Sequence, residues 1–180
     1  LSSTWISENC KIRDVDWALN NIEYYERIIY HFGNSSFHYH MFAMLARMPG
    51  VVVLHDFFLG DVSNFIEAHH IFQSFYSQSL YHSHGYKALF ERFTAENPQT
   101  VINKYPTNLP VLQNAKGIIV HSKFSQQLAD TWYGEGFSDD WSVIPLLRKT
   151  APDDFRDQAR EMLGFQPEDF LVCSFGLLGP

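Results

Sequence analysis

The sequence VVVLHD at residues 51–56 constrains the fold more than any other stretch of the chain. Its first four residues are apolar and mostly β-branched, which is typical of a strand buried on both faces of a parallel sheet. The polarity changes abruptly at His55 and Asp56, which follow this run directly. In open α/β sheets, ligands bind outside the carboxyl ends of the strands. The stretch therefore predicts a strand that places His55 and Asp56 at a binding edge.

Two further apolar runs end in polar residues in the same way. Residues 27–32 (RIIYHF) are followed by the turn sequence GNSS, and residues 117–120 (GIIV) are followed by the dipeptide HS. Parallel strands of one sheet share the edge at which their carboxyl ends emerge. We therefore expect the three polar ends to line one rim, and we expect this rim to be the functional site.

The segments around these strands complete an alternating pattern of strands and helices. Apolar residues at helical spacing over 37–48 predict a helix with one of the polar residues 34–36 as its N-cap, and a Pro-Gly pair ends it. Strand, helix and strand in this order form a βαβ unit, which is right-handed in nearly all proteins.

The remaining segments are predicted by the same patterns. They are aromatic-rich helices over 62–93 with a break near Gly85, a proline-rich loop at 97–110, a helix at 126–133, a strand at 141–145, a helix at 155–164 and a strand at 170–175. The expected fold class is α/β, a Rossmann-like parallel sheet flanked by helices. Because the sequence stops just after the last strand and its glycine turn, we also expect a truncated second α/β domain.

Composition excludes several classes of protein. A chain of 180 residues with 46% hydrophobic residues can bury a substantial core. No run reaches the roughly 20 apolar residues of a membrane span, and no signal peptide opens the sequence, so we expect a soluble, cytoplasmic protein. A net charge of −7 argues against nucleic acid as a partner. The two cysteines, Cys10 and Cys173, are expected to be reduced.

Each polar strand end has a functional and a structural interpretation. His55 can exchange hydrogen bonds near neutral pH and Asp56 can bind hydroxyls, or the pair can simply cap the next helix. Gly33 and Asn34 can let a ligand approach a helix N-terminus, or can form a plain turn. Ser122 can line the rim, or can be the N-cap of the helix that follows it.

Nine histidines raise the question of a metal site. The closely spaced pairs are His38 with His40, His69 with His70, and His82 with His84. Residues two apart on a helix point to different faces, so helical pairs of this spacing do not chelate together, and we expect no metal. The aromatic residues of 57–90 are expected to pack in the core, with an acceptor groove or a membrane surface as the alternative. The motifs of serine hydrolases, P-loop proteins and dinucleotide-binding proteins are missing.

Four pieces of the sequence follow one another in the order and spacing of a known family. They are IIYHFGNSSFHYHMFAMLARMPGVVVLHDFFLG (28–60), AKGIIVHSKFSQQL (115–128), WSVIPL (141–146) and REMLGFQPEDFLVCSFGLLGP (160–180). Together they resemble the retaining glycosyltransferases of family 4, which have the two-domain GT-B fold. The resemblance covers most of the chain from about residue 25 onward.

The resemblance implies a division of the chain into three parts. Residues 1–147 match an N-terminal acceptor-binding, Rossmann-like domain that lacks its first strand. Residues 148–169 match an interdomain linker and helix, and residues 170–180 match the first strand of a C-terminal nucleotide-sugar-binding domain. Such enzymes transfer a sugar from a nucleotide-sugar donor to a saccharide or lipid-linked acceptor, here in bacterial polysaccharide synthesis. They need no cofactor, and a lipid-linked acceptor implies peripheral association with the inner face of the membrane.

The resemblance also assigns residues to roles. His55 matches the histidine that faces the donor sugar and is expected to be catalytic. Positions that match the neighbouring cleft are Gly33, Asn34, His38, Asp56 and Ser122. Three features of the family have no match in these 180 residues. They are the glycine-rich first loop, the basic pair that holds the diphosphate, and the pair of glutamates. Because such groups stabilise the leaving diphosphate, the fragment by itself is expected to be inactive.

Two other functions compete with glycosyl transfer. One is a metal-dependent phosphohydrolase that uses histidine and aspartate residues. The other is a non-catalytic α/β module that binds a sugar or a partner protein.

Overall fold

The computed structural model describes residues 4–147, 155–166 and 168–172. The chain divides into two compact units, Leu1–Leu146 and Leu147–Pro180. The candidate rim residues all belong to the first unit, so the fold of that unit is the one that positions the site.

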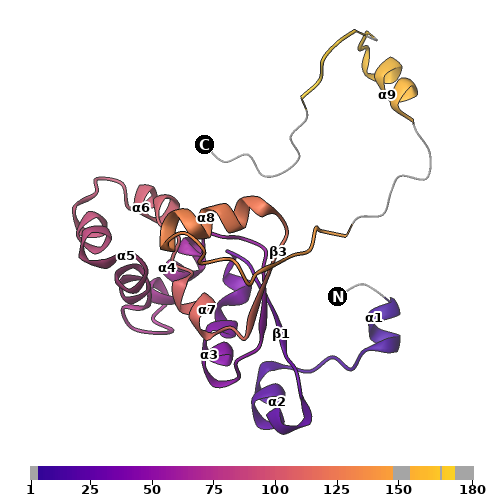
Figure 1. Ribbon diagram of the computed structural model, residues 1–180. Coiled ribbons are helices and arrows are strands. Elements are labelled where there is room, and N and C mark those ends of the chain that lie inside the picture. The colour runs from indigo at the N-terminus through magenta and orange to yellow at the C-terminus, as the bar shows by residue number, and fades with distance from the viewer. Residues whose placement is uncertain (1–3, 148–154, 167, 173–180) are drawn as a thin grey trace. The chain divides into compact units, whose positions relative to one another are not determined.

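A four-stranded parallel sheet lies at the centre of the first unit (Figure 1). Its strands are β1 (Ile29–Phe32), β2 (Val51–Leu54), β3 (Gly117–Val120) and β4 (Ser142–Val143), side by side in sequence order. Phe32 pairs with Leu54, and Leu54 pairs with Val120. The first three strands therefore end at one level, and the expected α/β class with a parallel sheet and flanking helices is confirmed.

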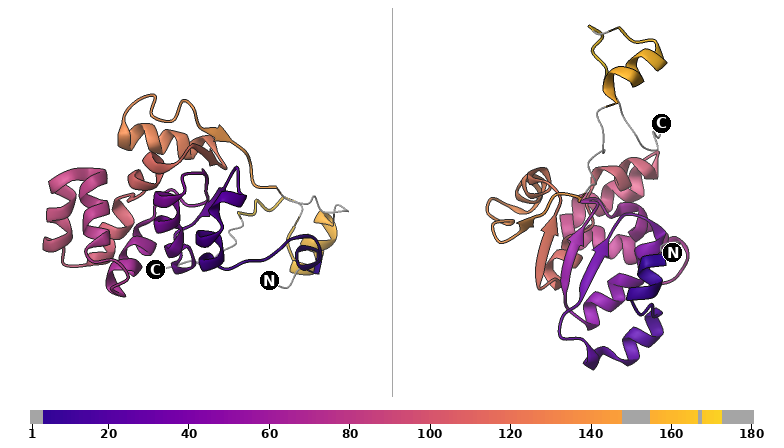
Figure 2. Two further views of the ribbon diagram at one scale, coloured as in Figure 1. Left: turned by 90° about the horizontal axis from the view of Figure 1, so that it is seen from below. Right: turned by 90° about the vertical axis from the view of Figure 1, so that its right-hand side faces the viewer.

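The helices that connect the strands pack beside the sheet, and α3 to α7 lie on one side of it (Figures 1 and 2). Between β1 and β2 are η2 (Ser36–His38) and α3 (Tyr39–Arg47); between β2 and β3 are α4 (Gly60–Ala68), α5 (Phe75–Thr94), α6 (Pro98–Lys104) and α7 (Leu109–Asn114). The helix α8 (Lys123–Tyr133) joins β3 to β4. Successive right-handed crossovers in one direction keep their helices on one face. Before the sheet, the chain forms α1 (Thr4–Asn9), α2 (Val15–Asn20) and η1 (Ile22–Tyr24).

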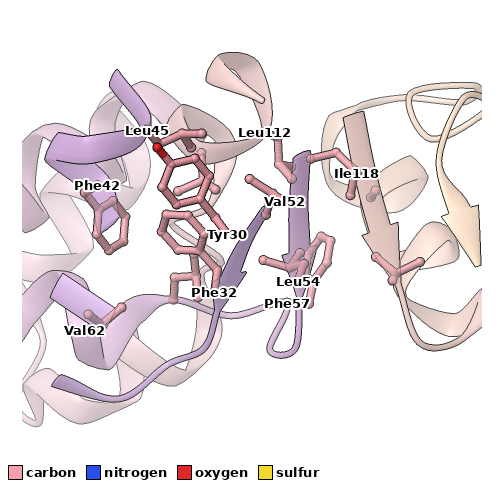
Figure 3. Close-up of a cluster of buried hydrophobic side chains, with 14 of the residues drawn as sticks. Tyr30, Phe32, Phe42, Leu45, Val52, Leu54, Phe57, Val62, Leu112 and Ile118 are labelled. Atoms are coloured by element: carbon pink, nitrogen blue, oxygen red, sulfur yellow. The ribbon is translucent and has the colours of Figure 1, made fainter. Parts of the chain in front are cut away.

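The main core lies between the sheet and these helices (Figure 3). Alternate strand residues point into it, and they are Tyr30, Phe32, Val52, Leu54, Ile118 and Val120. The other face of β1 is open, because Ile29 is 60% exposed and His31 is also exposed. Side chains at odd positions of the three strands therefore extend toward the less covered face, and this decides where the strand-end histidines point.

Most of the proline-rich segment 97–110 is helical, because α6 covers Pro98–Lys104 and α7 begins at Leu109, so the prediction of a loop holds only for residues 105–108 between them. Pro98 and Pro110 stand in the first turns of α6 and α7. In that position the missing N–H of proline has no helical partner to lose, and its fixed φ suits a helix start. The Asn97 side chain supports the start of α6 by accepting a hydrogen bond from the Gln99 N–H at 2.9 Å.

The aromatic residues of 57–90 are only partly core. Phe57 and Tyr76 are buried, whereas Tyr81, Tyr86 and Phe90 are more than half exposed. The expected break near Gly85 is confirmed, since α5 has a kink there with φ 72° and ψ −163°. The kink divides α5 into two helical segments, and exposed aromatic side chains lie on both of them.

The start of α3 also differs from its prediction. Its N-cap is His38, and no side chain of residues 34–36 caps it. Ser35 instead shares a hydrogen bond with the ring of His38, at 3.0 Å between Oγ and Nδ1. Asn34 caps a different helix, as the site geometry shows.

The second unit contains α9 (Arg156–Leu163), which ends at Gly164 with φ 75°. Of the strand expected at 170–175, the first three residues are described and are not in a strand, and the others lie outside the described residues. Cys10 is exposed and not in a disulfide, and Cys173 lies outside the described residues. Within the described ranges, none of the helices combines the length and the apolar character that crossing a membrane requires.

Candidate functional site

Three imidazole rings form a row at the carboxyl edge of the sheet. His31 lies on β1, His55 directly follows β2 and His121 directly follows β3. His31 Nδ1 lies 2.9 Å from His55 Nε2, and His55 Nδ1 lies 3.0 Å from His121 Nε2. The ring centroids are 5.2 Å and 4.9 Å apart. The three strand ends therefore meet through direct side-chain contacts.

The far end of this row contacts the main chain. His121 Nδ1 lies 2.9 Å from the carbonyl oxygen of Ile144, just after β4. The row thus crosses all four strands, from β1 to the end of β4. We call His31, His55 and His121 the histidine row.

The alternation of the strands explains why these rings meet. His31 pairs in register with Val53, and Val53 pairs with Ile119. His55 and His121 stand two positions after those partners, so all three rings extend on the same face of the sheet. That face is the less covered one, which leaves the row open to ligands.

Electrostatics favours a neutral ring at the centre of the row. Burial lowers the pKa of His55, and the neighbouring rings of His121 and His31 lower it further. The Asp56 carboxylate acts in the opposite direction, and His38 adds to the lowering. A ring held neutral at pH 7 can both donate and accept a hydrogen bond.

Asp56 and Asn34 join the β1 and β2 loops beside the row. Asp56 Oδ2 accepts a hydrogen bond from the Asn34 N–H at 2.8 Å. The Asn34 amide donates to Asp61 Oδ2 at 2.8 Å, and its oxygen accepts from the N–H groups of Asp61 and Val62 at 3.0 and 3.2 Å. Asn34 is therefore the cap of α4, and it does not leave the N-terminus of that helix free for an anion.

Gly33 is a position where two side chains approach the backbone closely. A Cβ atom at Gly33 would lie 2.8 Å from His38 Cε1 and 3.3 Å from Asp56 Oδ2. The side chains of His38 and Asp56 thus occupy the place that a Cβ atom would need, and only glycine leaves room for both of them. Ser122 stands at the N-cap position of α8 without a side-chain hydrogen bond to the helix. The rim thus brings together Gly33, Asn34, His38, His55 and Asp56, with Ser122 next to His121 in the chain.

The geometry of the histidines does not resemble a metal site. Among the described residues, no group of three histidine, cysteine, aspartate or glutamate side chains is arranged to hold a metal ion. The ring nitrogens in the row contact one another directly. His82 binds Gln113 Oε1 at 2.7 Å, and His84 binds the carbonyl oxygen of Pro106 at 2.5 Å. Each of these two rings of α5 thus has a protein partner of its own.

Two members of the row were not among the residues predicted from the sequence. His31 was expected inside a strand, and His121 was considered only together with the hydroxyl of Ser122. The strand period of two could have identified them. His31, His55 and His121 each stand two positions after an apolar strand residue and so share its face of the sheet. Asp61 was also missed, since its partner Asn34 lies 27 positions away.

Comparisons with known proteins found no relative of this chain. The chain matches no protein-family model, and neither the curated proteins nor the solved structures contain a significant match. What is established is the fold: the first unit has an α/β fold with a four-stranded parallel sheet, compatible with a Rossmann-like domain, and a histidine row at its carboxyl edge.

Proposed function

We propose that this chain is the acceptor-side part of a retaining glycosyltransferase of GT-B architecture. The enzyme transfers a sugar from a nucleotide-sugar donor to a saccharide or lipid-linked acceptor, in the synthesis of a polysaccharide. The observation that carries this proposal is the position of His55. It lies at the carboxyl edge of a parallel sheet, between two other imidazoles and beside a carboxylate.

The chemistry of the rim suits sugar hydroxyls. Imidazole nitrogens and carboxylate oxygens that are open at the rim match the hydroxyl groups of a sugar, which both donate and accept hydrogen bonds. Asp56 uses Oδ2 to hold the β1 loop through the Asn34 N–H. Its other oxygen is the one proposed to accept from a sugar. In this proposal His55 faces the donor sugar from within the row, where its two ring nitrogens already contact His31 and His121. Gly33, His38, Asp56 and Ser122 border the cleft.

Asn34 has a different role from the one its position suggested. Its backbone N–H and its side chain are engaged by Asp56 and by the first turn of α4. We propose that it fixes the shape of the rim rather than contacting the sugar. The donor diphosphate is proposed to bind to a second α/β domain that begins near residue 170.

A lipid-linked acceptor is supported by exposed aromatic side chains. Tyr86, Phe90 and Phe93 are 70%, 55% and 72% exposed, and their spacing places them on one side of α5. Aromatic side chains at the level of lipid headgroups hold proteins at membrane interfaces. We propose that this surface brings the protein to its acceptor.

The test is turnover of nucleotide sugars by the intact protein in which this chain occurs, with His55→Ala beside the unchanged protein. Loss of one stabilising group of this kind lowers turnover by about 10²–10³-fold. His82→Ala is the matched control, because His82 is an exposed histidine on α5 outside the rim. Equal turnover of His55→Ala and the unchanged protein would refute the proposal.

A further inference from the structure

The hydrogen bonds of the histidine row have a direction, which one backbone carbonyl sets. A carbonyl oxygen only accepts, so His121 Nδ1, at 2.9 Å from the Ile144 oxygen, must carry the hydrogen. In a neutral His121 the other nitrogen, Nε2, is then an acceptor. His55 Nδ1, 3.0 Å away, must therefore be the donor in that contact.

The same reasoning extends to the other end of the row. If His55 donates from Nδ1, its Nε2 is an acceptor, and the hydrogen in the 2.9 Å contact belongs to His31 Nδ1. Each neutral ring thus carries its hydrogen on Nδ1, and every contact has one donor and one acceptor. His31 Nε2 remains as a bare acceptor, and it has no hydrogen-bond partner among the residues that the structure describes. His31 is exposed, so solvent or a ligand can reach this atom.

The row can take up one proton without losing a hydrogen bond. A proton that arrives at His31 Nε2 makes that ring a cation, and its Nδ1 hydrogen can then pass to His55 Nε2. The Nδ1 hydrogen of His55 can pass in turn to His121 Nε2, which leaves the charge on His121 with its Nδ1–H still bonded to the Ile144 oxygen. The three charged states differ only in the positions of hydrogens along existing contacts.

A second proton does not fit in the same way. Two charged rings in contact would place two hydrogens in one contact, so that hydrogen bond would be lost while two like charges faced each other. The other charged or titratable groups near His55 are Asp56, in its own loop, and His38, in η2. One carboxylate can balance one added charge, but not two.

We infer that His31, His55 and His121 form a directed proton relay in which Nε2 of His31 is the group that accepts a proton from the attacking hydroxyl of the acceptor. The inference rests on the proposed function for the identity of that hydroxyl. In the step, the acceptor oxygen forms its bond to the anomeric carbon, the bond from that carbon to the diphosphate breaks, and the hydroxyl proton goes to His31 Nε2. His31 is then a catalytic residue, and His121 is a positioning residue that fixes the tautomers and receives the charge.

The first experiment measures the tautomers of the unaltered chain. In ¹⁵N-labelled protein, the nitrogen shifts of each imidazole show which nitrogen carries the hydrogen. At a pH where the row is neutral, all three rings are expected to carry it on Nδ1, and on acidification the row is expected to bind one proton in total. Hydrogen on Nε2 of His55 or His121 in the neutral row would overturn the inference, as would uptake of three protons in independent steps.

The second experiment removes the end of the row that sets the direction. In His121→Phe, His55 Nδ1 loses its acceptor, so the ring of His55 is expected to move its hydrogen to Nε2. His82→Phe is the matched control and should leave the row unchanged. If His121→Phe does not fold, the tautomers of the unaltered chain still decide the question. Unchanged Nδ1 protonation of His55 in a folded His121→Phe would count against the relay.

The pH profile of turnover in the intact protein links the relay to catalysis. Replacing His31 by Gln is expected to remove the acidic limb of the kcat profile, because the group that takes up the proton is gone. An acidic limb that persists in His31→Gln would overturn the assignment of His31. If all three rings carry hydrogen on Nδ1 but the intact protein transfers no sugar, the proposed function is refuted and the hydrogen-bond direction of the row still holds. If the protein transfers sugar but the rings carry hydrogen on Nε2, the relay is refuted and the proposed function still holds.

Discussion

Asn34 connects two loops and a helix through both ends of one amide group. Its oxygen accepts from the first N–H groups of α4, its nitrogen donates to Asp61, and its own N–H binds Asp56. A side-chain acceptor at a helix start satisfies donors that the helix leaves unpaired. The shape of the rim therefore depends on a residue that need not touch a ligand.

We expect Asn34→Ala to lower the free energy of unfolding by about 1–2 kcal/mol, the usual effect of losing a helix cap. Urea unfolding followed by circular dichroism measures this change. Asn64→Ala, within α4, is the matched control, because Asn64 makes no side-chain hydrogen bond to any residue described here. A cost for Asn34→Ala no larger than for the control would contradict the capping role.

Acid is expected to destabilise the fold through histidines whose pKa is lowered in the folded state. Burial lowers the pKa of His40, His55 and His84. Unfolding restores an ordinary pKa of about 6.5, so below this pH the unfolded chain binds protons before the folded chain does. Stability is therefore complete above about pH 6.5 and falls as the pH drops toward the lower folded values.

Urea unfolding at a series of pH values checks this prediction. His84→Phe is expected to reduce the slope of stability against pH. A free energy of unfolding that stays constant or rises on acidification through this range would contradict the account.

At the scale of single elements, the kink in α5 depends on glycine. Gly85 has φ 72° and ψ −163°, a conformation that is essentially restricted to glycine. Apart from its two chain neighbours and the nearby backbone of α5, no atom lies within 4 Å of a Cβ built at Gly85, so the main cost of a side chain there is backbone strain. We expect Gly85→Ala to lower stability by about 1–3 kcal/mol.

Thermal and urea unfolding of Gly85→Ala measures this cost. Gly117→Ala is the control, because its nearest neighbour would be Val51 Cγ2 at an ordinary 3.9 Å and its φ is not in the left-handed region. Equal stabilities of the two variants would show that α5 can straighten without penalty.

Elements with a strong local signal could be predicted from the sequence. The apolar runs at β2 and β3 are short and bounded by turn residues, and both strands begin and end where expected. The helices that begin near Pro98 and Pro110 were not predicted, because proline interrupts a helix in its interior but is also common in its first turn. The cap of α4 could not be predicted, since η2, α3 and β2 separate Asn34 from that helix in the chain.

At the scale of the whole first unit, the convergence of strand ends could be predicted but the contacts could not. Parallel strands of similar length place His55, Asp56 and the β1 loop at one edge whatever the side chains are. That His31, His55 and His121 meet depends on register and on strand face, which local sequence does not specify.

The exposed aromatic side chains of α5 lead to a prediction for membranes. Replacing Tyr86, Phe90 and Phe93 together by serine is expected to lower binding to vesicles of mixed neutral and anionic phospholipid, because it removes apolar area that can enter the interface. Sedimentation with the vesicles measures the bound fraction. Phe124→Ser, which removes an exposed aromatic from α8, is the control. Unchanged binding of the triple variant would contradict the proposed membrane surface.

The central claim is that the histidine row is where the sugar binds. The most direct test is to record the imidazole resonances of the 180-residue chain while a series of nucleotide sugars and oligosaccharides is added. The account predicts saturable shifts of the His31, His55 and His121 rings with at least one of them, and no shift of His69 or His82. Saturable binding that leaves all three rings unchanged would place the site elsewhere and contradict the account.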